Sequence, residues 1–157
     1  SVLESLNSTG GMVMAKVFES AVIPAPVEQV WKVVRDFNGL PSWHPAIERS
    51  EIEENRPADS VGCIRNFYLT NGDNIREQLL ALDDLNYRCD YTILKSGMAL
   101  TNYHAALWLI PVTEEDTTLA LWSADFDTAP ENEQELVETV GKGVFLGGLQ
   151  ALKKMFS

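Results

Sequence analysis

Positive charge is scarce in this 157-residue chain, where 12 Lys and Arg residues face 23 Asp and Glu residues and give a formal net charge of −11. No basic stripe is present to neutralise phosphates, so the sequence does not predict a nucleic-acid-binding protein. The acidity argues equally against docking on anionic lipid surfaces. Long apolar runs are also missing, since none approaches the roughly 20 residues that span a bilayer. We therefore expect neither nucleic acid nor stable membrane insertion.

Cysteine and histidine are rarer still, with two residues of each. Cys63 and Cys89 are the only cysteines, and both lie in strand-like segments where a small apolar side chain is typically buried. Neither has a third cysteine or a histidine close by, so a closed zinc site is excluded. His44 and His104 are predicted to lie on opposite faces and cannot chelate a metal together. Phosphate-loop, dinucleotide and nucleophile motifs are absent too, and we expect no metal or other cofactor.

The first 11 residues lack the basic start and apolar stretch of a signal peptide. They are typical of a tag or vector remnant ahead of a native Met12 or Met14, although a signal peptide removed earlier would leave no trace. Residues 12–157 are expected to form one domain, a length sufficient for a sizeable core. The two reduced thiols fit a cytoplasmic location.

The sequence contains the balance of an ordinary folded protein, with 45% hydrophobic and 22% charged residues. Its pattern predicts a first strand over 15–22, a helix over 27–37 that begins after Pro26, and a turn-rich piece over 40–45. Turn residues then separate the remaining predicted strands, which are 47–54, 61–70, 74–83, 87–94, 100–111 and 117–126. The short breaks favour an antiparallel meander.

A long helix is predicted from Pro130 to Met155. Thr128 and Glu131 have the spacing of a capping box at its start. The predicted inner face of the helix carries Gly141 and Gly148 in place of large side chains, although a mid-helix glycine costs about 1 kcal/mol relative to alanine. The fold class is therefore α+β, with a curved six- to seven-stranded antiparallel sheet around a long C-terminal helix and one or two short helices after the first strand. Glycines on the helix face leave space, so the arrangement predicts an internal cavity.

The sequence as a whole resembles the START-like, pollen-allergen-like helix-grip superfamily (SRPBCC). Within it, the chain is most similar to the polyketide cyclase/dehydrase and lipid-transport family. The resemblance covers residues 15–156 and lies in the order of several short motifs, which are Ala25-Pro26-Val27-Glu28-Gln29-Val30-Trp31, Leu40-Pro41-Ser42-Trp43-His44-Pro45-Ala46-Ile47, Val61-Gly62-Cys63-Ile64-Arg65, Arg76-Glu77-Gln78-Leu79 and Leu100-Thr101-Asn102-Tyr103. It implies a helix-grip domain that binds a ligand between the sheet and the C-terminal helix.

The pattern is also distantly similar to plant abscisic-acid receptors, but the differences are informative. Their Ser-Gly-Leu-Pro-Ala gate is replaced by residues 70–74, which read Thr-Asn-Gly-Asp-Asn, and their His-Arg-Leu latch by residues 98–100, which read Met-Ala-Leu. The lysine that pairs the hormone carboxylate corresponds to His44. A hormone switch that closes on a phosphatase is therefore not expected.

Cross-strand symmetry indicates which side chains share a face. Arg65 and Glu77 are equidistant from Asn71, so they are predicted to lie opposite each other, either in the cavity as a buried ion pair or on the solvent face as a weak one. Tyr91 and Tyr103 are symmetric about Gly97. They line the cavity in one interpretation and make ordinary cross-strand contacts in the other.

Two further positions follow from the same reasoning. A four-residue turn over 113–116 places Trp122 opposite Leu107 on the inner face, with Trp108 on the outer face. His44 matches an inward position of the resembled family, where an imidazole binds an anion or moves a proton; the alternative is a structural histidine that caps a turn. The candidate ligand-binding residues are His44, Arg65, Phe67, Leu69, Glu77, Leu79, Tyr91, Tyr103, Leu107, Trp122, Val140, Gly141, Val144 and Gly148.

We expect the protein to bind a small, mostly apolar molecule, such as a polyketide, an aromatic metabolite, an isoprenoid or a lipid fragment, with Arg65, Glu77 and His44 orienting it. The alternative is an enzyme of the cyclase or dehydratase type that uses Glu77 or His44 as general base. A third hypothesis is a filled core and a protein partner bound through an exposed apolar patch. The chain is expected to be a monomer or a weak dimer.

Overall fold

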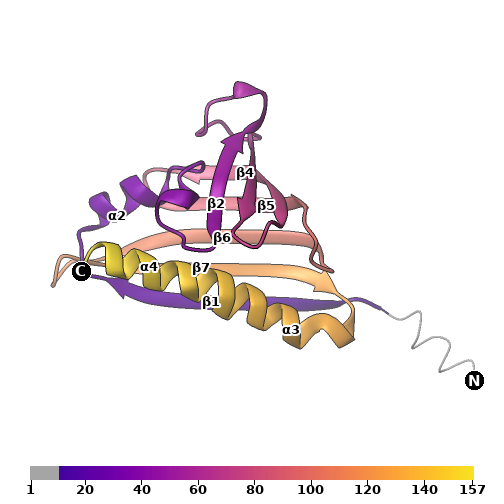
Figure 1. The fold of residues 1–157 in the computed structure, drawn as a ribbon. Coiled ribbons are helices and arrows are strands. Elements are labelled where there is room, and N and C mark those ends of the chain that lie inside the picture. The colour runs from indigo at the N-terminus through magenta and orange to yellow at the C-terminus, as the bar shows by residue number, and fades with distance from the viewer. Residues whose placement is uncertain (1–10) are drawn as a thin grey trace, which may run out of the picture.

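The computed structural model describes residues 11–157, and in it an open seven-stranded antiparallel sheet curves around a long C-terminal helix (Figure 1). The interpretation of the first 11 residues as a remnant lies outside the described residues except for Gly11. The α+β helix-grip architecture expected from the sequence is confirmed. Strand β1 runs across the view in Figure 1 whereas β2 points upward, so the sheet is strongly curved.

The sheet is a meander with one long connection. Its order is β1-β7-β6-β5-β4-β3-β2, and every neighbouring pair is antiparallel. The strands are β1 (Val13–Ile23), β2 (Ile47–Ile52), β3 (Ile64–Leu69), β4 (Asn74–Asp83), β5 (Arg88–Lys95), β6 (Thr101–Val112) and β7 (Thr117–Thr128). All seven were expected from alternation and turn residues, with boundaries that differ by a few residues.

The helices cover the concave side of the sheet. After β1 come α2 (Val27–Val34) and the short turns η1 (Leu40–Ser42) and η2 (Glu53–Asn55). The C-terminal helix is continuous but changes type along its length, through η3 (Pro130–Asn132), α3 (Glu133–Glu138), η4 (Thr139–Leu146) and α4 (Gly147–Met155). The η4 segment is π-helical. The predicted capping box is wrong, because Thr128 Oγ1 instead donates to Ala99 O at 2.7 Å and no side chain caps η3.

The predicted cross-strand register is confirmed at two places. Arg65 pairs directly with Glu77 across β3 and β4, and Leu107 pairs with Trp122 across β6 and β7. The symmetry about Gly97 is wrong by two residues, since Tyr91 lies opposite Ala105 rather than Tyr103. Asn102, with a φ of 52°, lies where the register of β6 against β7 shifts, between Thr101 and His104.

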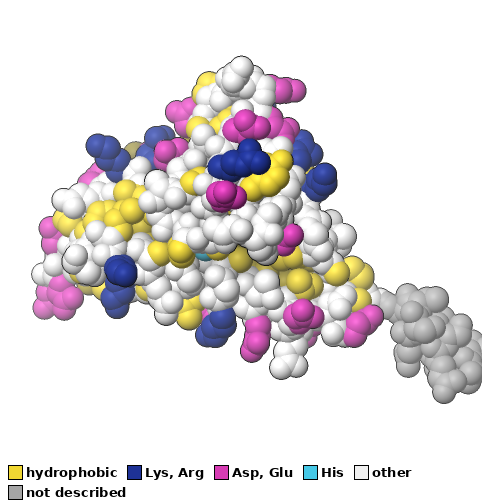
Figure 2. Space-filling view, in the orientation of Figure 1, with side chains coloured by type: hydrophobic (Ala, Val, Ile, Leu, Met, Phe, Trp, Pro, Cys, Tyr) yellow, Lys and Arg dark blue, Asp and Glu magenta, His cyan; other side chains and the backbone are white. Residues whose placement is uncertain are grey.

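The outer face of the sheet is mixed in character. Trp108 lies there as expected, against Phe18 at 6.5 Å between ring centroids and with the Arg88 guanidinium 5.1 Å from its ring. His104, opposite Asp125, bonds to Asp90 Oδ2 through Nε2 at 2.8 Å. On the other side of the molecule, which carries the C-terminal helix and is shown in Figure 2, acidic and basic side chains are interspersed. Within the described residues, no helix is long and apolar enough to span a membrane.

Candidate ligand-binding site

A pocket of about 470 Å³ lies between the concave face of the sheet and the π-helical part of the C-terminal helix. Strands β2 to β7 supply one wall, and η4 supplies the wall facing them. The turns after β3 and β5 contribute Asn71, Asp73 and Met98. The curvature of the sheet therefore leaves room where the strands diverge from the helix.

The polar centre of the pocket is the Arg65–Glu77 pair, whose side chains are 6% and 7% exposed. Arg65 Nε donates to Glu77 Oε1 at 2.9 Å, and Nη2 lies 2.7 Å from the same oxygen. Arg65 Nη1 donates to Phe37 O at 3.0 Å, just after α2. The rings of Phe37 and Tyr91 lie 4.0 and 4.7 Å from the guanidinium carbon. The solvent-facing alternative for this pair is therefore wrong.

Burial raises the pKa of Glu77 above its ordinary value, because loss of water disfavours the carboxylate more than the neighbouring Arg65 favours it. The pair is retained in its charged form, since neutralising the carboxyl would leave a buried guanidinium without a counter-charge. Burial also raises the pKa of Tyr91 and Tyr103 well above that of a free phenol. Both phenols therefore stay protonated and present polar O–H groups within an otherwise apolar wall.

Aromatic side chains extend from this centre toward the helix. Trp122 Nε1 donates to the Tyr91 hydroxyl at 3.0 Å, and Trp122 stacks on Phe145 with ring centroids 4.6 Å apart. Tyr103 stacks on Phe126 at 5.9 Å. These contacts hold the lining rings in fixed orientations, which is a requirement for a pocket with a defined shape.

His44 connects the turn after η1 to the C-terminal helix. Its Nε2 donates to Val144 O at 2.8 Å, and its Nδ1 accepts the backbone N–H of Ala46 at 3.1 Å. These two bonds require the tautomer protonated at Nε2. Burial lowers the pKa of His44, and the charge of Arg65 lowers it further. The residue lines the pocket with both ring nitrogens engaged, so its geometry matches the structural interpretation more closely than that of a free base.

The structure brings most of the candidate residues together around one pocket. Those that line it are His44, Arg65, Phe67, Leu69, Glu77, Tyr91, Tyr103, Trp122, Val140 and Val144. Leu79 and Leu107 instead belong to the buried core, where their cross-strand neighbours Tyr91 and Trp122 form the pocket wall. Their inclusion among the candidate ligand-binding residues requires correction, because two residues on the same sheet face can lie in the core and in the pocket respectively.

Gly141 and Gly148 also do not line the pocket, which corrects the idea that they leave space for a ligand. A Cβ on Gly148 would lie 2.8 Å from both His44 Cδ2 and Trp122 Cζ3, and one on Gly141 would lie 3.0 Å from Val17 Cγ1. The space is already filled by protein. Gly143 is the glycine that borders the pocket, with no atom within 4 Å of an added Cβ. The predicted inner face assumes α-helical spacing. The segment Thr139–Leu146 is π-helical, so a different set of residues faces the sheet.

Several lining residues were missed by the sequence interpretation. Ile75 and Ile93 each lie two residues from a predicted lining residue, Glu77 and Tyr91, so strand alternation contained the signal for them. Leu40, Ala46 and Ile47 flank His44 in the segment already singled out. The remaining lining residues lie in two hairpin turns and on the helix; they are Asn71, Asp73, Ser96, Gly97, Met98, Thr139 and Gly143.

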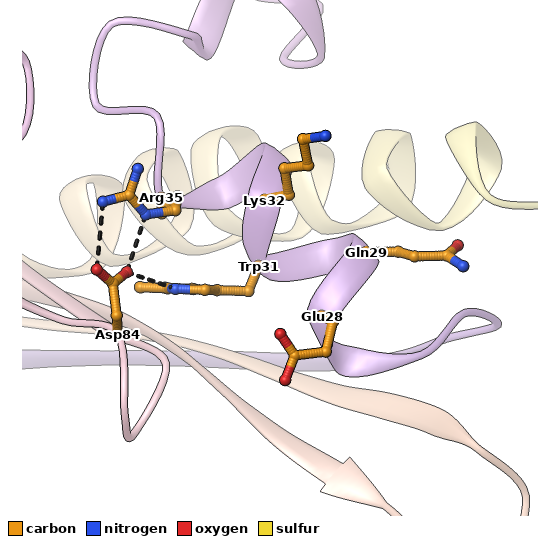
Figure 3. Close-up of a pocket in the computed structure, with 6 residues that line it drawn as sticks. All are labelled: Glu28, Gln29, Trp31, Lys32, Arg35 and Asp84. Carbon is orange, nitrogen blue, oxygen red and sulfur yellow. Dashed lines mark hydrogen bonds and ion pairs between the residues drawn. The ribbon is translucent and has the colours of Figure 1, made fainter.

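A second hollow, of about 560 Å³, lies on the surface beside α2 (Figure 3). Asp84 is central to it and accepts hydrogen bonds from Trp31 Nε1 at 2.8 Å and Arg35 Nε at 2.8 Å. Its principal polar groups thus satisfy one another, and the hollow is open to solvent. The internal pocket, with its apolar walls and few polar groups, matches the properties of a small-molecule site better.

Metal binding has no support among residues 11–157, where no three His, Cys, Asp or Glu side chains come together. Cys63 and Cys89 are buried and unbonded to each other. Burial raises the pKa of the Cys89 thiol to about 11, which keeps it protonated and unreactive.

Comparisons with known proteins agree on the architecture. The family model described as polyketide cyclase/dehydrase and lipid transport matches residues 14–156. The protein XoxI from Bacillus cereus is 30% identical, covering 90% of this chain and 95% of its own, with a TM-score of 0.81. A solution structure from Thermobifida fusca is 29% identical, covering 90% of this chain and 92% of its own, with a TM-score of 0.82.

A more distant match extends the likeness to an enzyme of the same fold. Norcoclaurine synthase from Thalictrum flavum, solved in complex with dopamine and hydroxybenzaldehyde, is 18% identical. The match covers 92% of this chain and 87% of the synthase, with a TM-score of 0.74. At that identity it shows the shared fold alone. The comparison with curated proteins finds no match.

Proposed function

This chain belongs to the polyketide cyclase/dehydrase and lipid-transport family, and we propose that it binds a small, mostly apolar molecule in the pocket between the sheet and the C-terminal helix. The observation that carries the proposal is the pocket itself, whose volume of about 470 Å³ lies in the range of roughly 300–1,000 Å³ typical of small-molecule sites. Apolar and aromatic side chains form its walls, and the polar groups are few and convergent.

The packing around the pocket favours this proposal over the filled-core hypothesis. Trp122, Tyr91 and Phe145 are held by mutual contacts, so the side chains around the pocket have no freedom to collapse into it. The pocket is bordered on one side by the turns after β3 and β5, which gives a ligand a route in from solvent. A polyketide, aromatic metabolite, isoprenoid or lipid fragment is the class of molecule that fits such walls.

The most informative experiment is native mass spectrometry of protein purified from its own source, in which we expect a co-purified apolar molecule. A second experiment uses the neutral dye Nile red, whose fluorescence rises in apolar surroundings. Val140→Phe extends a side chain into the pocket and is expected to abolish the rise. Gln150→Phe, on the exposed side of the same helix, is the matched control and should bind the dye like the unmodified protein.

Circular dichroism and melting curves of both variants establish that the helix still packs on the sheet. Equal dye binding by the Val140→Phe variant and the Gln150→Phe control, with both folded, would place the dye outside the pocket and contradict the proposal.

A second candidate function is a cyclase or dehydratase reaction in the same pocket, and the Glu77 geometry favours it over His44 as the base. Only Oε1 of Glu77 is bound to Arg65, which leaves Oε2 free to accept a proton, and burial raises the pKa of this carboxyl above its ordinary value. Exchange of acidic C–H protons of a bound ketone with deuterated water would reveal such a base. No exchange above the rate of the Glu77→Gln variant would leave binding as the function.

A further inference from the structure

The inner end of the pocket holds one carboxylate oxygen that the protein leaves without a partner. Glu77 Oε1 takes both contacts from Arg65, and Oε2 accepts no hydrogen bond from any described residue. Among the described residues, the enclosed side-chain atoms without partners are Asn38 Oδ1, Trp43 Nε1, Ser50 Oγ and Thr117 Oγ1. Glu77 Oε2 is not one of these, so it borders open space, and the space beside Glu77 is the pocket.

The other polar groups nearby are already engaged. Arg65 directs Nε and Nη2 at Glu77 Oε1 and Nη1 at Phe37 O, and no contact of the guanidinium with Glu77 Oε2 occurs. Both ring nitrogens of His44 are bonded to backbone groups. Of the carboxylate and imidazole acceptors at this end of the pocket, the one without a donor is Glu77 Oε2, and leaving a buried carboxylate oxygen unpaired is costly.

The balance of charge narrows the chemistry of that donor. Arg65 and Glu77 cancel, while Asp73 adds a negative charge to the pocket lining, so an anionic ligand meets a net negative site. An ammonium group would bring a further charge into a largely apolar pocket and lose its hydration there. A neutral hydroxyl supplies the donor without either penalty.

We propose, on the basis of the proposed binding function, that the natural ligand is a hydroxyl compound, an alcohol or phenol, whose O–H donates to Glu77 Oε2 at the inner end of the pocket. Glu77 then determines specificity, selecting a neutral donor among apolar molecules of similar shape. A ligand that ends in a carboxylate is rejected.

Four probes of one shape test this proposal on the unmodified protein, with displacement of Nile red as the measurement. 2-Naphthol carries the donor, 2-methoxynaphthalene lacks it, 2-naphthoate is an anion and 2-(aminomethyl)naphthalene is a cation. Because a hydrogen bond to a charged group contributes more than a neutral one, we expect 2-naphthol to bind at least about 10-fold more tightly than each of the others.

Any other ranking overturns the proposal. Equal or tighter binding of 2-methoxynaphthalene removes the need for a donor, tighter binding of 2-naphthoate assigns the site to anions through Arg65, and tighter binding of the ammonium probe assigns it to cations. These failures leave the proposed function intact as long as Nile red still binds in the pocket. Failure of Nile red itself to bind contradicts the proposed function instead.

Variants of the pair sharpen the result. In Glu77→Gln the amide oxygen is expected to take the Arg65 contacts and turn the NH2 group toward the pocket, so an acceptor is now preferred. 2-Methoxynaphthalene should then bind at least as tightly as 2-naphthol. Arg65→Met combined with Glu77→Leu removes the polar centre without an unpaired charge and should bind both probes equally. Retention of the 2-naphthol preference in this folded double variant would place the donor contact elsewhere.

Discussion

The two halves of the interface between the C-terminal helix and the sheet contrast sharply. Around Gly148 the helix lies so close to the sheet that an added Cβ would be 2.8 Å from two side chains, and every hydrogen-bonding atom of the neighbouring His44 ring is satisfied. Around Gly143 an added Cβ meets nothing within 4 Å, and a carboxylate oxygen of Glu77 borders open space. One helix therefore packs tightly against the fold at Gly148 and leaves room for a ligand beside Gly143.

The transition between the halves coincides with the π-helical segment Thr139–Leu146. Val144 lines the pocket with its side chain and accepts the His44 bond with its carbonyl oxygen, so it belongs to both halves. Single-turn π segments are frequent at functional sites, where the altered hydrogen bonding frees a carbonyl. The contrast indicates that the tight contacts around Gly148 (the closed half) hold the helix in place, so that the pocket around Gly143 (the open half) stays open.

The largest predicted effect concerns the one buried ion pair of the pocket half. Glu77→Ala should lower the free energy of unfolding by about 3–5 kcal/mol, because it leaves the Arg65 guanidinium buried without its partner. Urea denaturation followed by far-UV circular dichroism gives the change. The control replaces both partners, Arg65→Met with Glu77→Leu, and should recover most of the stability. A loss below about 1 kcal/mol for Glu77→Ala would show that the pocket half tolerates an unpaired charge.

The next effect tests the closed half. Gly148→Ala should destabilise the fold by about 1–3 kcal/mol, because the new methyl group is forced against His44 and Trp122 in a part of the core that has no space. Thermal unfolding monitored through tryptophan fluorescence also reports the displacement of Trp122. An unchanged melting temperature would mean that the closed half can open by a few tenths of an ångström without penalty.

The sequence predicted the fold almost completely, and the physical reason is that each strand carries its own alternation and its own turn residues. The Arg65–Glu77 pairing followed from the distance of each residue to Asn71, because antiparallel register propagates from a turn. The register between β5 and β6 did not follow, because Tyr91 pairs with Ala105 and the connection is therefore longer than a turn centred on Gly97. Local rules therefore specified the register where the connection is a tight turn.

The candidate site was predicted less completely because a pocket is a property of packing rather than of periodicity. Gly141 and Gly148 lie in close contact with neighbouring side chains, whereas Gly143 borders the pocket, although all three belong to one helix. Only the π-helical geometry separates them, and it depends on tertiary contacts such as the His44 bond to Val144 O. The correct residues on the strands, by contrast, followed from which face is buried.

A pH-dependent effect distinguishes the two halves further. Burial lowers the pKa of His44 below its ordinary value of 6.5, so the unfolded chain takes up this proton before the folded protein does. The stability that the fold gains from keeping His44 neutral is complete above about pH 6.5. It is lost as the pH falls below that value, at up to about 1.4 kcal/mol per pH unit, until the folded His44 is itself protonated.

The measurement is the difference in the free energy of unfolding between the unmodified protein and His44→Gln from pH 7.5 to pH 5. Taking the difference cancels the contributions of all other groups, which the two proteins share. A difference that stays constant over this range would mean that a charged imidazole is accommodated between the helix and Trp122.

The smallest effect has the opposite sign and lies in the open half. Gly143→Ala should stabilise the fold by up to about 1 kcal/mol, because alanine loses less backbone freedom in a helix than glycine and its methyl group meets no atom within 4 Å. The same methyl group borders the pocket, so Nile red should bind more weakly than to the unmodified protein while the melting temperature rises.

Gly148→Ala is the matched comparison, since the chemical change is identical and only the surroundings differ. If both substitutions destabilise the fold by similar amounts, the helix is equally constrained along its length and the division into a closed and an open half does not hold. Opposite signs for the two would show that the helix tolerates added volume only where the structure leaves space for a ligand.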